Sequence, residues 1–297
     1  MFPPTTVIGA GGYLGSRFHH ELSRQDPNTI GATRRPRDGM RLLDLHAPNL
    51  DALQLPDDVG CAIVTAGMTG ILACEQHPVE ARRVNVEGTL ELASQLANKS
   101  IVPVLFSTDY VFDGASDAYS DDADACPLNV YGATKAELEQ ELPRVCGNDY
   151  LLLRMSKLYS PTPGDGTLVN EMISRLRGGQ ELRAATDQVF CPTTVDDVVR
   201  IVLQLLRKGC RGLFNLAAAE AFSRYHIAKT AANALGIPED RITKIRLDDL
   251  AEPFERPKRT TLRCDRLNQV LPDAGFTSLS DAVARLTLPG DHSTDAA

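Results

Sequence analysis

The stretch TTVIGAGGYLG, residues 5–15, decides the fold. Thr5–Gly9 is an apolar run that predicts a buried strand, and the glycines that follow open a helix reaching about Arg24. The spacing GxxGxxG removes Cβ atoms where a tight turn must let the backbone approach a pyrophosphate, and the helix N-terminus offers free N–H groups. The order strand, loop, helix therefore predicts a dinucleotide site on this loop, contacted by Gly9, Gly11, Gly12, Tyr13, Leu14 and Gly15.

Short apolar runs alternate with helical patterns through the rest of the first half. Strands are predicted at 29–33, 61–65, 103–107 and 150–154, and helices at 78–98 and 131–142. Strands that alternate with helices imply a parallel sheet covered on both faces, with right-handed crossovers. The predicted fold class is α/β: a Rossmann-type doubly wound parallel sheet with a smaller α/β C-terminal substrate-binding domain.

The second half is less regular and predicts the domain boundaries. Helices are expected at 167–177, 194–207, 223–235 and 280–286, a strand at 212–215 and a loop at 253–259. We assign residues 1–155 to the dinucleotide-binding domain, with 190–215 returning to it. Residues 156–189 and 216–287 form the substrate-binding domain, and 288–297 a flexible tail.

Composition excludes several classes of function. The net charge of −8 and the lack of a basic stripe argue against nucleic-acid binding, and no apolar run is long enough for a membrane span. Seven scattered cysteines without a CxxC, and six histidines without ligand spacing, argue against disulfides and against a metal site. We expect a cytoplasmic protein, leave a homodimer open, and interpret the acids at 121, 122 and 124 as a solvated loop.

The second predicted strand indicates which dinucleotide the site prefers. An NAD site usually has an acid at the end of this strand, whereas this chain has Arg34 and Arg35. Guanidinium groups pair with a 2′-phosphate, so NADP(H) is the preferred cofactor and NAD(H) the alternative. A solvated turn whose arginines point elsewhere is the other interpretation. Asp44-Leu45 is expected beside the adenine, and Ala66-Gly67 at the end of the third long strand.

Tyr131 and Lys135 form a YxxxK pair on a predicted helix. Residues four apart lie on one helix face, so the ammonium can favour the phenolate and lower the pKa of the phenol. The tyrosine can then exchange a proton with a reacting oxygen. Thr108, with Ser107 beside it, ends a buried strand where a hydroxyl can bond the substrate oxygen. A capped strand end and a core tyrosine are the alternative.

The runs STDYVFDG (107–114) and CPLNVYGATKAELE (126–139) resemble the dTDP-4-dehydrorhamnose reductase family of extended short-chain dehydrogenases/reductases, which bind sugar nucleotides. The similarity extends to about residue 287 and includes VNVEGT at 84–89. It implies an NAD(P)-dependent oxidoreductase with a Thr108-Tyr131-Lys135 triad. Asn85, Ser107, Tyr131 and Lys135 are expected to contact the cofactor, with Asn85 also supporting the active site. It also implies reduction of a 4-keto-6-deoxy sugar on a nucleotide, the sugar approached by Asp109, Tyr110 and Val111.

Two departures from this family fall in the substrate-facing half. Lys157 stands where the family often has tryptophan, and Phe190 where it usually has glycine. We expect Lys157 to contact the substrate. Arg256, with Lys258 and Arg259 next to it, is the candidate for the diphosphate.

Other functions on the same fold remain open. The chain also resembles the regulatory subunit of methionine adenosyltransferase, a cofactor-binding partner protein. An extended-family epimerase or 4,6-dehydratase is a further alternative. Such dehydratases follow the threonine with Asp-Glu, whereas this chain has Asp109-Tyr110.

Overall fold

A computed structural model describes residues 3–36, 39–160, 162 and 164–288, and its centre is one parallel sheet of seven strands. The strand order is β11-β6-β5-β4-β1-β2-β3, and every neighbouring pair is parallel. The bounds are β1 Thr5–Ile8, β2 Gly31–Thr33, β3 Arg41–Leu42, β4 Cys61–Val64, β5 Val102–Thr108, β6 Leu151–Met155 and β11 Gly212–Leu216. The predicted Rossmann-type sheet is confirmed.

The central strands are buried on both faces. All seven residues of β5 are buried, and Thr108 at its end pairs with Met155 of β6. Continuous apolar runs of this kind are typical of parallel strands covered by two helical layers. The carboxyl ends of β1, β4, β5 and β6 therefore open together at one edge of the sheet.

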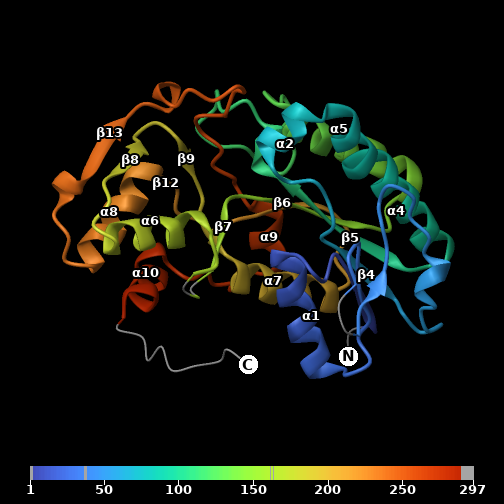
Figure 1. Ribbon diagram of the computed structural model, residues 1–297. Coiled ribbons are helices and arrows are strands. Elements are labelled where there is room, and N and C mark those ends of the chain that lie inside the picture. Colours follow the sequence, from blue (N-terminus) through green and yellow to red (C-terminus); the bar gives the residue numbers. More distant parts are fainter. Residues whose placement is uncertain (1–2, 37–38, 161, 163, 289–297) are drawn as a thin grey trace.

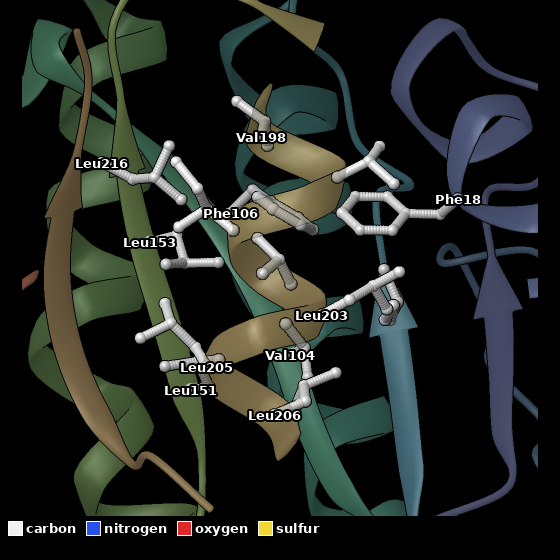
Figure 2. Packing of buried hydrophobic residues seen from close by; sticks show 14 of the residues in the cluster. Phe18, Val104, Phe106, Leu151, Leu153, Val198, Leu203, Leu205, Leu206 and Leu216 are labelled. Carbon is white, nitrogen blue, oxygen red and sulfur yellow. The ribbon is translucent and has the colours of Figure 1, made fainter. Parts of the chain in front are cut away.

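One helical layer consists of α1 (Tyr13–Gln25), α7 (Val195–Arg207) and α9 (Asp265–Val270). Figure 2 shows that Val198, Leu203 and Leu206 of α7 pack against the sheet. Phe18 of α1 packs on Phe106 of β5 with ring centroids 5.7 Å apart. This packing fixes the helix that follows the glycine turn against the strand that carries Thr108.

The other layer consists of α3 (Pro78–Arg82), η2 (Arg83–Gly88), α4 (Thr89–Asn98) and α5 (Val130–Cys146). The sequence predicted one helix over 78–98, but the structure inserts the π-helical turn η2 into it. A Cβ on Gly88 would lie 1.7 Å from the carbonyl oxygen of Leu45. The absence of a Cβ at Gly88 thus lets the helix pass directly against the loop after β3.

A second lobe gathers the C-terminal elements around its own core, as Figure 1 shows. Its helices are α6 (Leu168–Arg177), α8 (Arg224–Ala234) and α10 (Leu279–Thr287). Small sheets join β8 (Leu182–Ala185) to β13 (Ile242–Ile245), β9 (Val189–Phe190) to β12 (Phe222–Ser223), and β7 (Leu158–Tyr159) to β10 (Thr193–Thr194). Ser223 caps α8 as predicted, since its side chain accepts from the His226 N–H.

One expectation differs from the structure, another lies mostly outside the described residues, and several short elements were not predicted. Asp121 was expected in a solvated loop but is buried, and its carboxylate accepts from the backbone N–H groups of Asn215 and Arg266. The short elements β3, β7–β10, β12, β13, α2 (Ile71–Gln76) and α9 were not predicted. Of the expected flexible tail, residues 289–297 lie outside the described residues. None of the described helices is long and apolar enough to cross a membrane.

Candidate active site

The turn between β1 and α1 has no room for side chains at two of its glycines. Gly9 has φ +96°, and a Cβ on it would lie 2.5 Å from the backbone nitrogen of Ala66. A Cβ on Gly15 would lie 2.1 Å from the carbonyl oxygen of Gly9. Gly12 caps α1 without a side-chain hydrogen bond, which leaves the N–H groups of the first turn available to an anion. The turn therefore fits a dinucleotide diphosphate.

A cavity of about 510 Å³ opens beside this turn. It brings together most of the predicted cofactor residues: Gly9, Gly11, Gly12, Arg34, Arg35, Asp44, Leu45, Ala66 and Gly67. The two arginines thus lie on the same wall as the adenine-side residues, as a 2′-phosphate would require.

His46 was not predicted, although it follows Asp44-Leu45 directly. It lines the first cavity, and its Nδ1 lies 2.8 Å from Oδ1 of Asp44. Burial alone would raise the pKa of Asp44, but hydrogen bonds from His46 and the charge on Arg34 bring that pKa below its ordinary value. Asp44 is therefore held as a carboxylate at the wall of this cavity.

A second cavity, of about 650 Å³, adjoins the first and shares Gly12, Thr65, Ala66 and Gly67 with it. The remaining predicted residues on its wall are Tyr13, Leu14, Ser107, Thr108, Asp109, Tyr110, Tyr131, Lys135 and Lys157. The structure thus gathers the glycine turn, the end of β5 and the first turns of α5 around one cleft.

Thr108, Tyr131 and Lys135 meet at the floor of this second cavity. Thr108 and Lys135 are buried and Tyr131 is half-buried. Lys135 donates from Nζ to the carbonyl oxygen of Phe106 at 3.0 Å, and the Thr108 hydroxyl accepts from the Tyr110 N–H at 3.2 Å and donates to Asp109 at 3.3 Å. Burial lowers the pKa of Lys135 to about 8, although the Glu139 carboxylate acts against this.

The Tyr131 pKa was expected to be lowered, but the surrounding protein groups raise it. Desolvation raises this pKa, and the nearby Asp109 adds to the rise, while only the Thr108 hydroxyl acts in the other direction among the main causes. Lys135 is not among the main causes, and its ammonium donates to the Phe106 carbonyl. Tyr131 is therefore protonated, the state that a proton donor needs.

Two side chains that sequence reasoning missed hold the start of α5. Glu75 of α2 accepts from the Val130 N–H at 2.7 Å, and Asn129 accepts from the Gly132 N–H at 2.9 Å. A Cβ on Gly132 would lie 2.1 Å from the Tyr110 carbonyl oxygen, so only glycine lets the helix approach this closely. An asparagine just before the YGxxK run was the available signal for the N-cap.

Asn85 lies behind the cleft and is not among the residues that line either cavity. Its amide accepts from the Met68 N–H at 2.7 Å and donates to the Met68 carbonyl at 2.8 Å. It also donates to the Thr134 hydroxyl at 3.2 Å. Asn85 therefore ties the loop after β4 to α5 and does not line the cavity with the other residues expected to bind the cofactor.

Of the three residues after Thr108, Asp109 and Tyr110 line the cavity and Val111 lies in the hydrophobic core. Asp109 is buried and accepts from Thr260 at 2.7 Å and from Ser156 at 3.0 Å. Burial raises the pKa of Asp109 to about 6 in spite of these hydroxyls. Val111 was expected to approach the sugar, but its fully buried side chain packs in a hydrophobic cluster with Phe112 and does not line the cavity.

Of the two cations expected at the substrate, Lys157 lines the second cavity and Arg256 does not. Lys157 and the unpredicted Arg224 line the cavity, and Nε of Arg224 is buried without a partner among the described residues. Arg256 does not line it. It pairs with Glu252 and donates to the Tyr110 hydroxyl, which does line the cavity, at 3.2 Å.

Lys258 and Arg259 form ion pairs elsewhere, with Asp248 at 2.7 Å and with Asp117 at 3.4 Å. Neither residue lines the cavity, and the side chains of Asp248 and Asp117 are largely exposed. Desolvation by the cavity wall and the charges on Arg224 and Arg256 lower the pKa of Lys157. Within the described ranges, no three potential metal ligands of the His, Cys, Asp or Glu type cluster together.

Comparison with known proteins gives one family. Residues 5–284 match the family described as RmlD substrate binding domain. A dTDP-4-dehydrorhamnose reductase of Mycolicibacterium smegmatis is 32% identical, over 93% of this chain and 81% of the relative. Methionine adenosyltransferase 2 subunit beta of Danio rerio is 26% identical, over 96% of this chain and 90% of the relative.

A solved structure supports the fold. The dTDP-4-dehydrorhamnose reductase of Bacillus anthracis, crystallised in complex with NADP, superposes with a TM-score of 0.83 at 22% identity. The alignment covers 96% of this chain and 99% of that one.

Proposed function

This chain belongs to the RmlD substrate binding domain family, and from that premise we propose that it is an NAD(P)H-dependent oxidoreductase. It reduces the keto group of a nucleotide-activated 4-keto-6-deoxy sugar. Two relatives are named dTDP-4-dehydrorhamnose reductase, a name that describes this reaction. NADP(H) is the preferred cofactor and NAD(H) the alternative.

One observation carries the proposal: Thr108, Tyr131 and Lys135 line the floor of a cavity that adjoins the glycine turn. When bound, the nicotinamide dinucleotide supplies the hydride. Thr108 donates a hydrogen bond to the keto oxygen, and Tyr131 donates the proton that the reduced oxygen needs. Lys135 supplies positive charge from the same face of α5 as that proton leaves.

The other residues of the cleft have supporting roles in this proposal. The cofactor is held by Gly9, Gly11, Gly12, Tyr13, Leu14, Gly15, Arg34, Arg35, Asp44, Leu45, Ala66, Gly67 and Ser107, with Asn85 behind them. Asp109 and Tyr110 approach the sugar. Lys157 and Arg224 are the cations for the diphosphate, since neither forms an ion pair with another described residue, while Arg256 is paired with Glu252.

The wider organisation follows from the same proposal. Residues 1–155 and 190–215 bind the cofactor, and 156–189 and 216–287 bind the sugar nucleotide. A cytoplasmic location agrees with seven free cysteines. A homodimer and the absence of nucleic-acid binding stay predictions, which light scattering and a gel-shift assay can test.

The test is a panel of 4-keto-6-deoxy sugar nucleotides with NADPH and NADH, followed by the absorbance of the reduced nicotinamide. The wild-type protein should oxidise NADPH with at least one of them, and Tyr131→Phe should be slower by about 10²- to 10⁴-fold with unchanged NADPH affinity. Wild-type protein that turns over none of the panel would contradict the proposal. Co-purification of a stoichiometric synthetase with an inactive protein would support the alternative of a regulatory subunit like that of methionine adenosyltransferase.

A further inference from the structure

Two consecutive residues of β5 each bond a different side chain of α5. The Phe106 carbonyl accepts from Lys135, and the Ser107 hydroxyl donates to Glu139. Lys135 and Glu139 are four residues apart on α5, so they share one face of the helix. Glu139 therefore holds the residue of β5 that lies between the Lys135 contact and Thr108.

Glu139 is also half of a buried ion pair. Its carboxylate accepts from Nη2 of Arg154 at 2.7 Å and from Nε at 3.0 Å, and both side chains are almost fully buried. Arg154 is held from behind by the Asp121 carbonyl at 3.1 Å and lies over the Phe112 ring. Burying both charges of such a pair costs desolvation free energy. Its presence on the same helix face as Lys135 therefore points to a role for Glu139 at the active site.

The surroundings of Lys135 contain few other charges that could hold its proton. The Cys74 thiol of α2 lies nearby, and burial raises its pKa, so it stays neutral. Asp109 is tied to Thr260 and Ser156, and Tyr131 is protonated. Arg154 from β6 is a cation, and Tyr150, before that strand, is a phenol with a raised pKa. Among the described groups, Glu139 is the carboxylate that opposes the effect of burial on Lys135.

We propose that Glu139 is a positioning residue of this active site, which fixes the Thr108 end of β5 through Ser107 and holds Lys135 in its ammonium form. The functional consequence rests on the proposed reductase activity, but the charge state of Lys135 does not. The Arg154 partner limits the influence of Glu139, since the pair together carries no net charge.

The test is direct titration of Lys135 by NMR on the whole protein without substrate. Lysine labelled with ¹³C at Cε gives one signal for each lysine, and Lys135→Arg identifies the signal that disappears. In the wild type the midpoint should lie near the value of about 8 that burial produces. In Glu139→Gln, which leaves Arg154 as an uncompensated cation, the midpoint should fall by about one unit.

Two further variants keep the test decisive. Glu139→Gln/Arg154→Gln replaces both charges, should fold even if the single variant does not, and should show a smaller fall. Glu141→Gln, an exposed carboxylate of the same helix bonded to Arg144, should leave the midpoint unchanged. A Lys135 midpoint that is the same in wild type, Glu139→Gln and the double variant overturns the proposal.

The activity arm uses the keto-sugar substrate found in the panel above. The alkaline fall of kcat/KM should move to lower pH in Glu139→Gln in step with the NMR midpoint. A uniform loss at all pH values, with an unmoved midpoint, would mean that Glu139 acts only in packing. If no substrate is turned over, the NMR titration still decides the inference, so its failure and that of the proposed function remain distinct.

Discussion

The phenol of Tyr13 donates a hydrogen bond to Oδ2 of Asp165 at 2.8 Å. Tyr13 begins α1 directly after the glycine turn, and Asp165 also accepts from the N–H of Thr167 at 2.9 Å. Thr167 is the N-cap residue of α6. This pair therefore joins the glycine turn to the start of the second lobe beside the second cavity, which both Tyr13 and Thr167 line.

Removing this link should weaken cofactor binding more than catalysis. Burial and the Asp165 carboxylate raise the pKa of Tyr13, so the phenol remains a donor. Tyr13→Phe should raise the KM for NADPH by about threefold to tenfold, with kcat within about twofold, because one hydrogen bond to a carboxylate is lost at a partly exposed site. Tyr225→Phe, which loses a surface bond to Glu239, is the control and should leave KM unchanged. Equal KM values for Tyr13→Phe and wild type would show that the link is not used.

The arginines after β2 should decide between the two dinucleotides. Arg34→Ser and Arg35→Ser should each weaken NADPH binding by about tenfold to a hundredfold and change NADH binding by less than about twofold. The reason is that only NADPH carries the 2′-phosphate. Isothermal titration with both cofactors measures this, with Arg41→Ser as a control, because Arg41 bonds the Gln54 carbonyl outside the cavity. Parallel losses for the two cofactors would refute the assignment.

The cations of the second cavity should act on the sugar nucleotide. Arg224→Gln and Lys157→Gln should raise the KM for the substrate by roughly tenfold each, while NADPH affinity stays the same, because each removes a charge that faces the diphosphate. Lys258→Gln should have little effect, since Lys258 pairs with Asp248 on the surface. Steady-state kinetics at saturating NADPH give the answer. The assignment fails if Lys258→Gln costs as much as Arg224→Gln.

The raised pKa of Asp109 should make the free energy of unfolding decrease as the pH rises. Its pKa is about 6 in the folded protein, against an ordinary value of 3.8, so the folded state keeps a proton that the unfolded chain has lost. This contribution to the free energy of unfolding is complete below about pH 4 and is lost as the pH rises through about 6. It amounts to roughly 3 kcal/mol on the scale of about 1.36 kcal/mol for each pKa unit.

Urea unfolding of wild type and Asp109→Asn between about pH 4 and 7 isolates this contribution, because the other groups titrate alike in both proteins. The stability of the variant relative to wild type should increase across that range. Asp117→Asn, at an almost fully exposed carboxylate, should give a flat difference. A flat difference for Asp109→Asn as well would contradict the buried, proton-holding state of Asp109.

Long elements and local spacings could be predicted from the sequence. The strands β1, β4, β5 and β6 carry apolar runs because a parallel strand buried on both faces has no polar side. The YxxxK spacing placed Tyr131 and Lys135 on one helix face for the same local reason. Elements of two residues, such as β7 and β9, could not be predicted, since they are too short to show a period.

The surroundings of charged side chains could not be predicted from the sequence. Arg224, Lys258 and Asp121 are all charged side chains in polar segments, yet one faces the cavity, one pairs on the surface and one is buried under backbone N–H groups. Nothing in the neighbouring sequence separates these outcomes, because each depends on segments that are distant along the chain.

The sequence by itself determined the parallel sheet, the glycine turn and the positions of Thr108, Tyr131 and Lys135, because these follow from strand burial and helix periodicity within single segments. Only the tertiary structure decided that Lys135 faces the Phe106 carbonyl, that Glu139 and Arg154 pair beneath it, and that Val111 belongs to the core. The physical reason is that burial and the partners of a charge are set by packing between β5, α5 and β6, and such contacts leave no periodic trace in any one of them.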